Sequence, residues 1–192
     1  MGKSLKGSKT EKNLLISFAG ESQARNRYTF FASAAKKEGF EQISSIFTET
    51  AEQEKEHAKI FFKYLEGGNV EITASYPAGV IGNTAQNLEA AAAGEHGEWS
   101  HDYPMFAKIA KEEGFDDVAN SFTKIGLVEE QHEKRYLTLL GRVKAGKVFE
   151  RDEVVEWQCR NCGFVFVGKK APEKCPSCLH PQAYFEVKKN NY

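Results

Sequence analysis

The stretch KKEGFEQISSIF at residues 36–47 returns as KEEGFDDVANSF at residues 111–122, 75 positions further along the chain. In both copies a glycine separates a charged run from apolar residues at three- and four-residue spacing, which is typical of a turn between two amphipathic helices. The apolar period predicts helices over residues 10–37, from just after Gly39 to residue 65, and over 83–113 and 115–143. The repeat therefore predicts two helical hairpins, which stack into a four-helix bundle.

The two hairpins are joined by residues 67–82 (GGNVEITASYPAGVIG), which lose the helical period. These 16 residues exceed the roughly 2–8 residues that usually connect neighbouring bundle helices. At about 3.3 Å per residue, the segment is long enough to follow a helix of about 25 residues from end to end. We therefore expect a long crossover, as in ferritin-like bundles.

Carboxylates and histidines replace apolar residues of the buried seam at matching positions of the two hairpins and at similar heights. They are Glu21 on the first helix, Glu54 and His57 on the second, Glu95 on the third, and Glu129 and His132 on the fourth. Four uncompensated carboxylates would cost more than the roughly 5–15 kcal/mol by which a domain is stable, so they must be protonated, paired or bound to metal. One Glu from each of two helices, with Glu-x-x-His from each of the others, is the ligand set of di-iron and di-manganese bundles. Oxygen ligands with one imidazole per metal favour iron or manganese over zinc.

Other polar residues of these helices lie off the seam or lack a repeat partner. They are Glu52, Glu56, Glu130, Glu133, His96 and His101. A single acidic residue or histidine on a helix is usually solvated, so we expect these six at the surface.

The repeat fails at one place on the third predicted helix. The offset is 74 at Glu95 and 75 at Tyr103, so one residue is inserted between them, and Glu98 aligns with Ala24. Single insertions in helices form π-bulges, often at functional sites, and Pro104 lacks a backbone donor there. We predict a distorted turn between Glu98 and Tyr103 that directs Glu98 toward the metals. The alternative is an exposed Glu98 on a simple proline kink.

All four cysteines lie near the end of the sequence, as Cys159-Arg-Asn-Cys162 and, after twelve residues, Cys175-Pro-Ser-Cys178. Two Cys-x-x-Cys pairs at this separation predict a tetrahedral four-thiolate metal site. A segment this short needs the metal to fold, and a reducing compartment disfavours the alternative of two disulfides. Thiolate ligands suit both iron and zinc, so a redox iron centre and a zinc ribbon both fit the spacing.

Composition narrows the classes of function. A formal net charge of −1, with 28% charged and 41% hydrophobic residues, gives no basic surface for nucleic acid. No apolar run is long enough for a membrane span, and the start, MGKSLKGSKTEK, lacks the apolar region of a signal peptide. We expect a cytoplasmic protein with no nucleic-acid or membrane partner. Its predicted parts are a helical bundle at 1–146, a linker at 147–153 and a metal-stapled β domain at 154–192.

Five segments together resemble the rubrerythrin family over essentially the whole chain: AGESQARNRY (19–28), EQEKEH (52–57), AAAGEHGEW (91–99), VEEQHEKR (128–135) and CRNCG…CPSC (159–178). The resemblance implies a ferritin-like di-iron bundle followed by a rubredoxin-like domain with one iron. It implies reduction of hydrogen peroxide to water as a defence against oxidative stress. It also implies an external electron donor, an NAD(P)H-linked reductase or a rubredoxin, and a homodimer or homotetramer.

The same resemblance implies a role for each matching residue. The two irons would be held by Glu21, Glu54, His57, Glu95, Glu98, Glu129 and His132, and the third iron by Cys159, Cys162, Cys175 and Cys178, with zinc as the alternative metal at either site. Tyr28 and Tyr103 match tyrosines that hydrogen-bond the ligating carboxylates. His57 and Glu98 match ligands that exchange at one iron when its oxidation state changes, so we expect catalytic roles for these two residues and the two tyrosines.

The sequence departs from rubredoxins at Leu179, where a glycine usually follows the second Cys-x-x-Cys pair. We therefore expect the amide–sulfur hydrogen bonds of this loop to differ. Two other functions also fit the residues: a ferroxidase or iron-handling protein, and a zinc-ribbon binding module on a helical scaffold. Iron storage would need a hollow multimer, which an appended cysteine domain disfavours.

Overall fold

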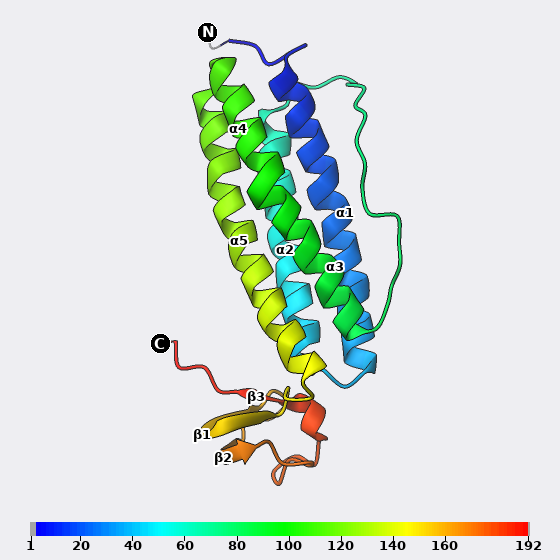
Figure 1. Ribbon diagram of the computed structural model, residues 1–192, viewed down its shortest axis with the longest axis vertical. Helices are drawn as coiled ribbons and strands as arrows, with labels where there is room; N and C mark the ends of the chain where they lie inside the picture. Colours follow the sequence, from blue (N-terminus) through cyan, green and yellow to red (C-terminus); the bar gives the residue numbers. More distant parts are fainter. Residues whose placement is uncertain (1–2, 192) are drawn as a thin grey trace.

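The computed structural model describes residues 3–191 of the chain, which form a long helical bundle with a small β domain at one end (Figure 1). The helices are α1 (Lys9–Lys37), α2 (Glu41–Tyr64), α3 (Thr84–Gly97), α4 (Tyr103–Glu112) and α5 (Asp116–Lys144), with a π-helical turn, η1 (Glu98–Asp102), between α3 and α4. The four predicted helices are confirmed, and the third is divided by the π turn. Within residues 3–191, none of the helices is both long and apolar enough to cross a bilayer.

The turns inside the two hairpins are built alike. Gly39 and Gly114 have φ values of 82° and 79°, a left-handed conformation that glycine adopts without strain. The next amide in each turn closes a hydrogen bond back onto the preceding helix, Phe40 to the carbonyl of Ala35 at 2.9 Å and Phe115 to that of Ala110 at 2.8 Å. The repeated KKEGF and KEEGF segments therefore form helix ends of the same kind.

Residues 65–83 have no regular secondary structure and follow the outside of the bundle from the end of α2 to the start of α3 (Figure 1). The predicted crossover is confirmed, and because of it α2 and α3 point in the same direction. At its far end, the Asn83 side chain accepts from the Gln86 amide while the Gln86 side chain accepts from the Asn83 amide, a capping box that starts α3.

The bundle core is divided into two apolar clusters along its length. The first lies toward the Gly39 turn and includes Tyr28, Phe31, Phe47, Leu88 and Tyr136. The second lies toward the Gly114 turn and includes Leu14, Phe61, Phe106, Phe122 and Ile125. The seam carboxylates fall between the two clusters, so a layer of polar groups is enclosed by aromatic side chains at both ends.

The tail forms an antiparallel sheet of β1 (Glu150–Cys159), β2 (Val165–Lys170) and β3 (Phe185–Val187), in the order β2-β1-β3. A short helix, η2 (Gln182–Tyr184), directly precedes β3. Trp157 is fully buried at its centre and donates its indole N–H to the Gly168 carbonyl at 3.0 Å. Strand β1 begins at Glu150, inside the segment expected to be a linker. The Phe149 ring stacks on Phe40, with centroids 6.2 Å apart, which holds the sheet against the end of the bundle.

Candidate metal centres

Two groups of ligands meet in the middle of the bundle. Glu21, Glu54, His57 and Glu129 form one group, and Glu54, Glu95, Glu129 and His132 form the other. Within each group, one ligand atom per residue lies within 4.8 Å of those of the others, and all six residues are buried. Glu54 and Glu129 belong to both groups, which is the position of carboxylates that bridge two ions. The structure therefore brings together all six residues predicted from the seam.

Each imidazole faces both shared carboxylates. His57 Nδ1 lies 2.9 Å from Glu54 Oε2 and 2.9 Å from Glu129 Oε1. His132 Nδ1 lies 2.7 Å from Glu129 Oε2 and 3.1 Å from Glu54 Oε1. The arrangement follows from the internal repeat, because each Glu-x-x-His places its two side chains on one face of its own helix.

Two buried tyrosines hold the carboxylates that are not shared. Tyr28 donates its hydroxyl to Glu95 Oε1 at 2.6 Å, and Tyr103 donates to Glu21 Oε1. Each bond leaves the second carboxylate oxygen, Oε2 of Glu95 or of Glu21, buried without a hydrogen-bond partner. The tyrosines therefore orient one oxygen of each carboxylate and leave the other available to an ion.

Gln53 is a further orienting residue, and sequence reasoning missed it. Its side-chain oxygen lies 2.9 Å from His132 Nε2, which places the imidazole proton on that nitrogen. When the ring is neutral, as metal binding requires, the lone pair of Nδ1 then faces Glu54 and Glu129. The only signal for Gln53 in the sequence was its place beside Glu54, which does not distinguish it from any other polar residue of the helix.

Burial dominates the electrostatics of the outer carboxylates. It raises the pKa of Glu21, Glu95 and Glu98 well above the ordinary value, and repulsion from Glu54 and Glu129 raises the pKa of each further. These groups favour their protonated forms unless a cation compensates them. The site therefore attracts positive charge.

In the absence of metal, the imidazoles supply that positive charge. Burial opposes ionisation of His57 and His132, but hydrogen bonds to Glu129 and Glu54 outweigh it and raise the two pKa values to about 10 and about 9. The same bonds outweigh burial at Glu54 and lower its pKa to about 2. Metal binding must therefore displace protons from both imidazoles.

The donor atoms fit a pair of iron ions. Oε2 of Glu21 and Oε2 of Glu95 are buried without a hydrogen-bond partner, and the oxygens of Glu54 and Glu129 face the two imidazoles. Buried acceptors without donors are costly, and a divalent cation satisfies many of them at once. A set of carboxylate oxygens with one imidazole for each ion is suited to iron or manganese.

The predicted distortion of the third helix is confirmed, because η1 is a π-helical turn over residues 98–102. Glu98, at its start, is half-buried and belongs to neither ligand group. It lines a pocket between α1 and the crossover, together with Gly20 and Tyr103. The turn thus directs Glu98 inward, beside the six seam residues. Coordination of metal by Glu98 remains a prediction.

Four of the six residues expected at the surface are exposed: Glu52, Glu56, His96 and His101. Glu130 is partly buried, with 30% of its side chain exposed beside Lys134. For Glu133 the prediction is wrong, because only 15% of its side chain is exposed and it accepts from the Trp99 indole at 2.5 Å. Trp99 lies in the π turn, where the helical period no longer indicates which side chains face a neighbouring helix.

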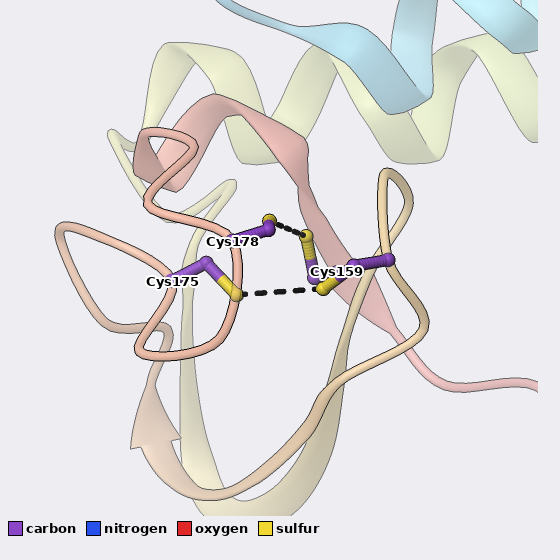
Figure 2. A group of neighbouring side chains, drawn as sticks. Cys159, Cys175 and Cys178 are labelled. Atoms are coloured by element: carbon purple, nitrogen blue, oxygen red, sulfur yellow. Dashed lines mark hydrogen bonds between the residues drawn. The ribbon is translucent and has the colours of Figure 1, made fainter.

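The side chains of Cys159, Cys175 and Cys178 converge in the β domain (Figure 2), and Cys162 completes a group of four with them. The Sγ atoms of Cys159 and Cys178 lie 3.7 Å apart, as do those of Cys162 and Cys175. A disulfide requires about 2.05 Å, so the disulfide alternative is wrong and the thiols are free. Four sulfurs about 2.3 Å from a central metal lie about 3.8 Å from one another in a tetrahedron, so this spacing fits a metal–thiolate site.

The second cysteine loop keeps the turn of the first despite Leu179. The amide of Gly163 donates to the Cys159 carbonyl at 2.8 Å, and the amide of Leu179 donates to the Cys175 carbonyl at 2.9 Å. Among residues 3–191, Leu179 is the one non-glycine residue with a positive φ, 63°. The leucine does not alter the turn, because its backbone adopts the left-handed conformation that glycine would adopt. The expected difference in the amide–sulfur hydrogen bonds stays a prediction.

Hydrogen bonding and burial act differently on two of the thiols. A backbone hydrogen bond from His180 lowers the pKa of Cys178 to about 6. Burial raises the pKa of Cys159 to about 12. The amide at position 180 therefore still reaches the sulfur beside Leu179 and favours its thiolate form, the form that binds metal.

Comparison with known proteins matches both parts of the chain. Residues 12–140 match the family model for rubrerythrin, and residues 157–186 match the model for the rubredoxin-like domain of rubrerythrin. A rubrerythrin of Porphyromonas gingivalis is 67% identical over 192 residues, covering 100% of this chain and 96% of the relative. One of Nitratidesulfovibrio vulgaris is 58% identical, covering 96% and 97%. A solved structure of mixed-valence nigerythrin is 32% identical, with a TM-score of 0.61, and covers 97% of this chain and 92% of that one.

Proposed function

Because this chain belongs to the rubrerythrin family, we propose that it reduces hydrogen peroxide to water. Its cofactors are a di-iron carboxylate site in the ferritin-like bundle and a four-cysteine rubredoxin-like site in the tail. The observation that carries the proposal is the pair of ligand groups sharing Glu54 and Glu129, on the same polypeptide as a thiolate metal site. The shared carboxylates suit a two-electron reaction, and the thiolate site suits its reloading with single electrons.

We assign the bundle ligands by their place in the two groups. Glu54 and Glu129, which belong to both groups, would be shared by the two irons, and Glu21 and Glu95 would each belong to one. His57 and His132 would each hold one iron, since Nδ1 of each faces the shared carboxylates. Bound as a ferrous pair, the two irons supply both electrons needed to cleave the O–O bond without releasing a hydroxyl radical.

The surrounding residues hold the carboxylates in a constant orientation while the oxidation state of the irons changes. Tyr28 and Tyr103 fix one oxygen of Glu95 and of Glu21, so the other oxygen keeps its direction through turnover. Glu98 lies beside Gly20, the neighbour of Glu21, and its charge raises the pKa of both Glu21 and Glu95. We propose that Glu98 and His57 alternate as ligands of one iron, as the family resemblance implies.

The two metal sites of one subunit are well separated. Helix α5 continues for twelve residues from His132 to Lys144 before the β domain begins, which is about 18 Å at 1.5 Å per residue. We propose that the tail of one subunit reduces the bundle of another, in a head-to-tail homodimer or homotetramer. An external donor, an NAD(P)H-linked reductase or a rubredoxin in the cytoplasm, would reduce the tail.

The proposal is tested by reducing the purified iron-loaded protein without oxygen and then adding hydrogen peroxide. We expect the red colour of the thiolate iron to bleach on reduction and to return with peroxide, without release of iron. A ferroxidase would instead release ferric iron into a larger assembly, visible by gel filtration. A colourless protein that holds zinc in the tail and does not consume peroxide would contradict the proposal.

Glu98→Ala tests the role of the extra carboxylate. We expect it to lower peroxide turnover by about tenfold to a hundredfold, because one ligand position is lost while the six other ligands stay. Redox-linked changes in the di-iron absorption should shrink in parallel. Full activity with unchanged spectra would contradict the assignment of Glu98.

A further inference from the structure

A pocket of about 480 Å³ lies between α1, the crossover and the start of α4. Crossover residues 73–77 form one wall, Gly20 of α1 lies opposite, and Glu98 and Tyr103 line the side that faces the carboxylate site. Since Tyr103 also donates to Glu21, the pocket extends from the surface to a residue in direct contact with a proposed ligand. Figure 1 shows the crossover running along this side of the bundle.

The pocket wall carries buried polar groups that have no partner in the protein. Ser17 is only 3% exposed, yet its hydroxyl makes no hydrogen bond, and the amide nitrogen of Asn13 and Nε of Arg27 are also unpaired. Two other hydroxyls of α1 bond back to their own helix, Ser22 to the Phe18 carbonyl at 2.6 Å and Thr29 to the Arg25 carbonyl at 3.0 Å. Unpaired buried donors and acceptors are costly, so this wall is suited to a small guest that both donates and accepts hydrogen bonds.

Tyr76 closes the crossover over this wall. Its hydroxyl donates to the Ile16 carbonyl at 2.7 Å, which ties the irregular segment to α1. A Cβ at Gly20 would lie 3.6 Å from the Tyr76 ring and 3.9 Å from Glu98 Oε1. Gly20 therefore lies between the Tyr76 ring and Glu98. Because glycine has no side chain, the space between them stays open.

We infer that this pocket is the entry port for hydrogen peroxide and that Tyr76 is the gating residue that excludes bulkier hydroperoxides. The inference rests on the proposed peroxidase function. Hydrogen peroxide is small, uncharged and able to donate and accept, which matches the unpaired groups of Asn13 and Ser17 on the wall. Because residues 65–83 have no regular secondary structure, the hydrogen bond of Tyr76 to α1 is a local restraint that a single substitution can remove.

The first experiment opens the port. In iron-loaded Tyr76→Ala protein, we expect kcat/KM for tert-butyl hydroperoxide, relative to that for hydrogen peroxide, to rise by about tenfold, since fit in a pocket of this kind discriminates by such factors. Tyr64→Ala is the matched control, because Tyr64 also bonds across elements, to Ser121 at 2.9 Å, but lies outside the pocket. An unchanged ratio in Tyr76→Ala, or an equal rise in the control, would overturn the inference.

The second experiment measures entry without turnover. Azide is added to the oxidised iron-loaded protein, and its rate of binding is followed by visible absorbance. We expect Gly20→Val, which fills the space between Tyr76 and Glu98, to slow azide binding by about tenfold and Tyr76→Ala to accelerate it, as for a gated step. Gly141→Val is the control, because its side chain enters open space on α5. Equal rates in wild type and both pocket variants would overturn the inference.

The two proposals fail separately. If the wild-type protein consumes no peroxide, the proposed function is wrong, whereas the azide rates still decide whether this pocket is the port. If Gly20→Val loses iron because of its neighbour Glu21, the Tyr76→Ala and Tyr64→Ala pair carries the same test. A normal iron content with wild-type azide rates in Tyr76→Ala counts against the port alone.

Discussion

The two metal sites of this chain are built in opposite ways. The bundle ligands project from long helices whose aromatic clusters pack above and below them. The thiolate ligands lie on two loops around a small core that contains Trp157 and Phe185. Helices with their own packed core can hold a site open without metal, whereas a domain of this size depends on its metal to fold.

The sites also differ in how charge is compensated without metal. In the bundle, protonated His57 and His132 lie against the shared carboxylates and offset part of their charge. In the β domain the four sulfurs face one another, and the nearest compensation is hydrogen bonding from the loop backbone. We therefore expect the bundle to tolerate loss of metal and the β domain to lose its structure.

Removal of the thiolate metal should have the largest effect on stability. Cys175→Ser is expected to unfold the β domain, because structural thiolate sites contribute roughly 10–16 kcal/mol of apparent binding free energy. The signal of buried Trp157 in near-UV circular dichroism should disappear, while far-UV helicity persists. A protein that loses both signals together would show that the two parts unfold as one unit, so the bundle would not tolerate loss of the thiolate metal.

Loss of a shared carboxylate should have the next largest effect, confined to the bundle. Glu129→Gln removes charge from both ligand groups, so we expect both bundle irons to be lost with the thiolate iron retained. Tyr28→Phe is the matched milder change, because Tyr28 only orients Glu95, and such outer partners change metal affinity by roughly 10–100-fold. Iron analysis with visible spectra measures both. Equal iron content in the two variants would contradict the assignment of Glu129 as a bridge.

The pH dependence of the metal-free bundle should be smaller, and its sign follows from the pKa shifts. Folding raises the pKa of His57 from 6.5 to about 10 and that of His132 from 6.5 to about 9, so their contribution is complete below pH 6.5 and lost as pH rises through 9 to 10. The pKa of Glu54 falls from 4.5 to about 2, so its contribution is complete above pH 4.5 and lost toward pH 2. The raised pKa values of Glu21, Glu95 and Glu98 act in the same direction as those of the imidazoles, because their contribution is complete below pH 4.5 and is lost as pH rises. The metal-free bundle is therefore most stable near pH 4.5 and loses stability toward higher pH.

Urea unfolding at pH 6 and pH 9 measures this effect. Without metal, we expect the free energy of unfolding to fall at the higher pH, by on the order of 3 kcal/mol for each imidazole. With iron the trend should reverse, because metal binding competes with protons and strengthens as pH rises. An apo-protein equally stable at both pH values would show that the imidazoles are not the cations that compensate the carboxylates.

The sequence predicted the features that depend on periodicity. The bundle, the crossover, the grouping of the six seam residues and the π turn all followed from the repeat and from the single residue by which it slips. The Trp99–Glu133 pair was missed because it depends on the side-chain direction inside that turn. The pocket under Tyr76 was missed because residues 67–82 have no period from which a buried face can be read.

The smallest expected effect on stability concerns the two cysteine loops. Leu179 occupies a left-handed conformation at φ 63°, and Gly163 occupies the equivalent position at φ 78°. The left-handed conformation costs a residue with a Cβ about 1 kcal/mol, and Leu179 is 62% exposed, so little packing offsets that cost.

We therefore expect Leu179→Gly to stabilise the iron-loaded β domain by somewhat less than about 1 kcal/mol, after the added flexibility of glycine in the unfolded chain is subtracted. Gly163→Ala should destabilise it by a similar amount. Thermal loss of the iron–thiolate absorption measures both variants in otherwise unchanged protein. If Leu179→Gly instead lowers the midpoint, the leucine side chain stabilises the site by a contact that outweighs its backbone strain, and the two loops are equivalent in geometry but not in energy.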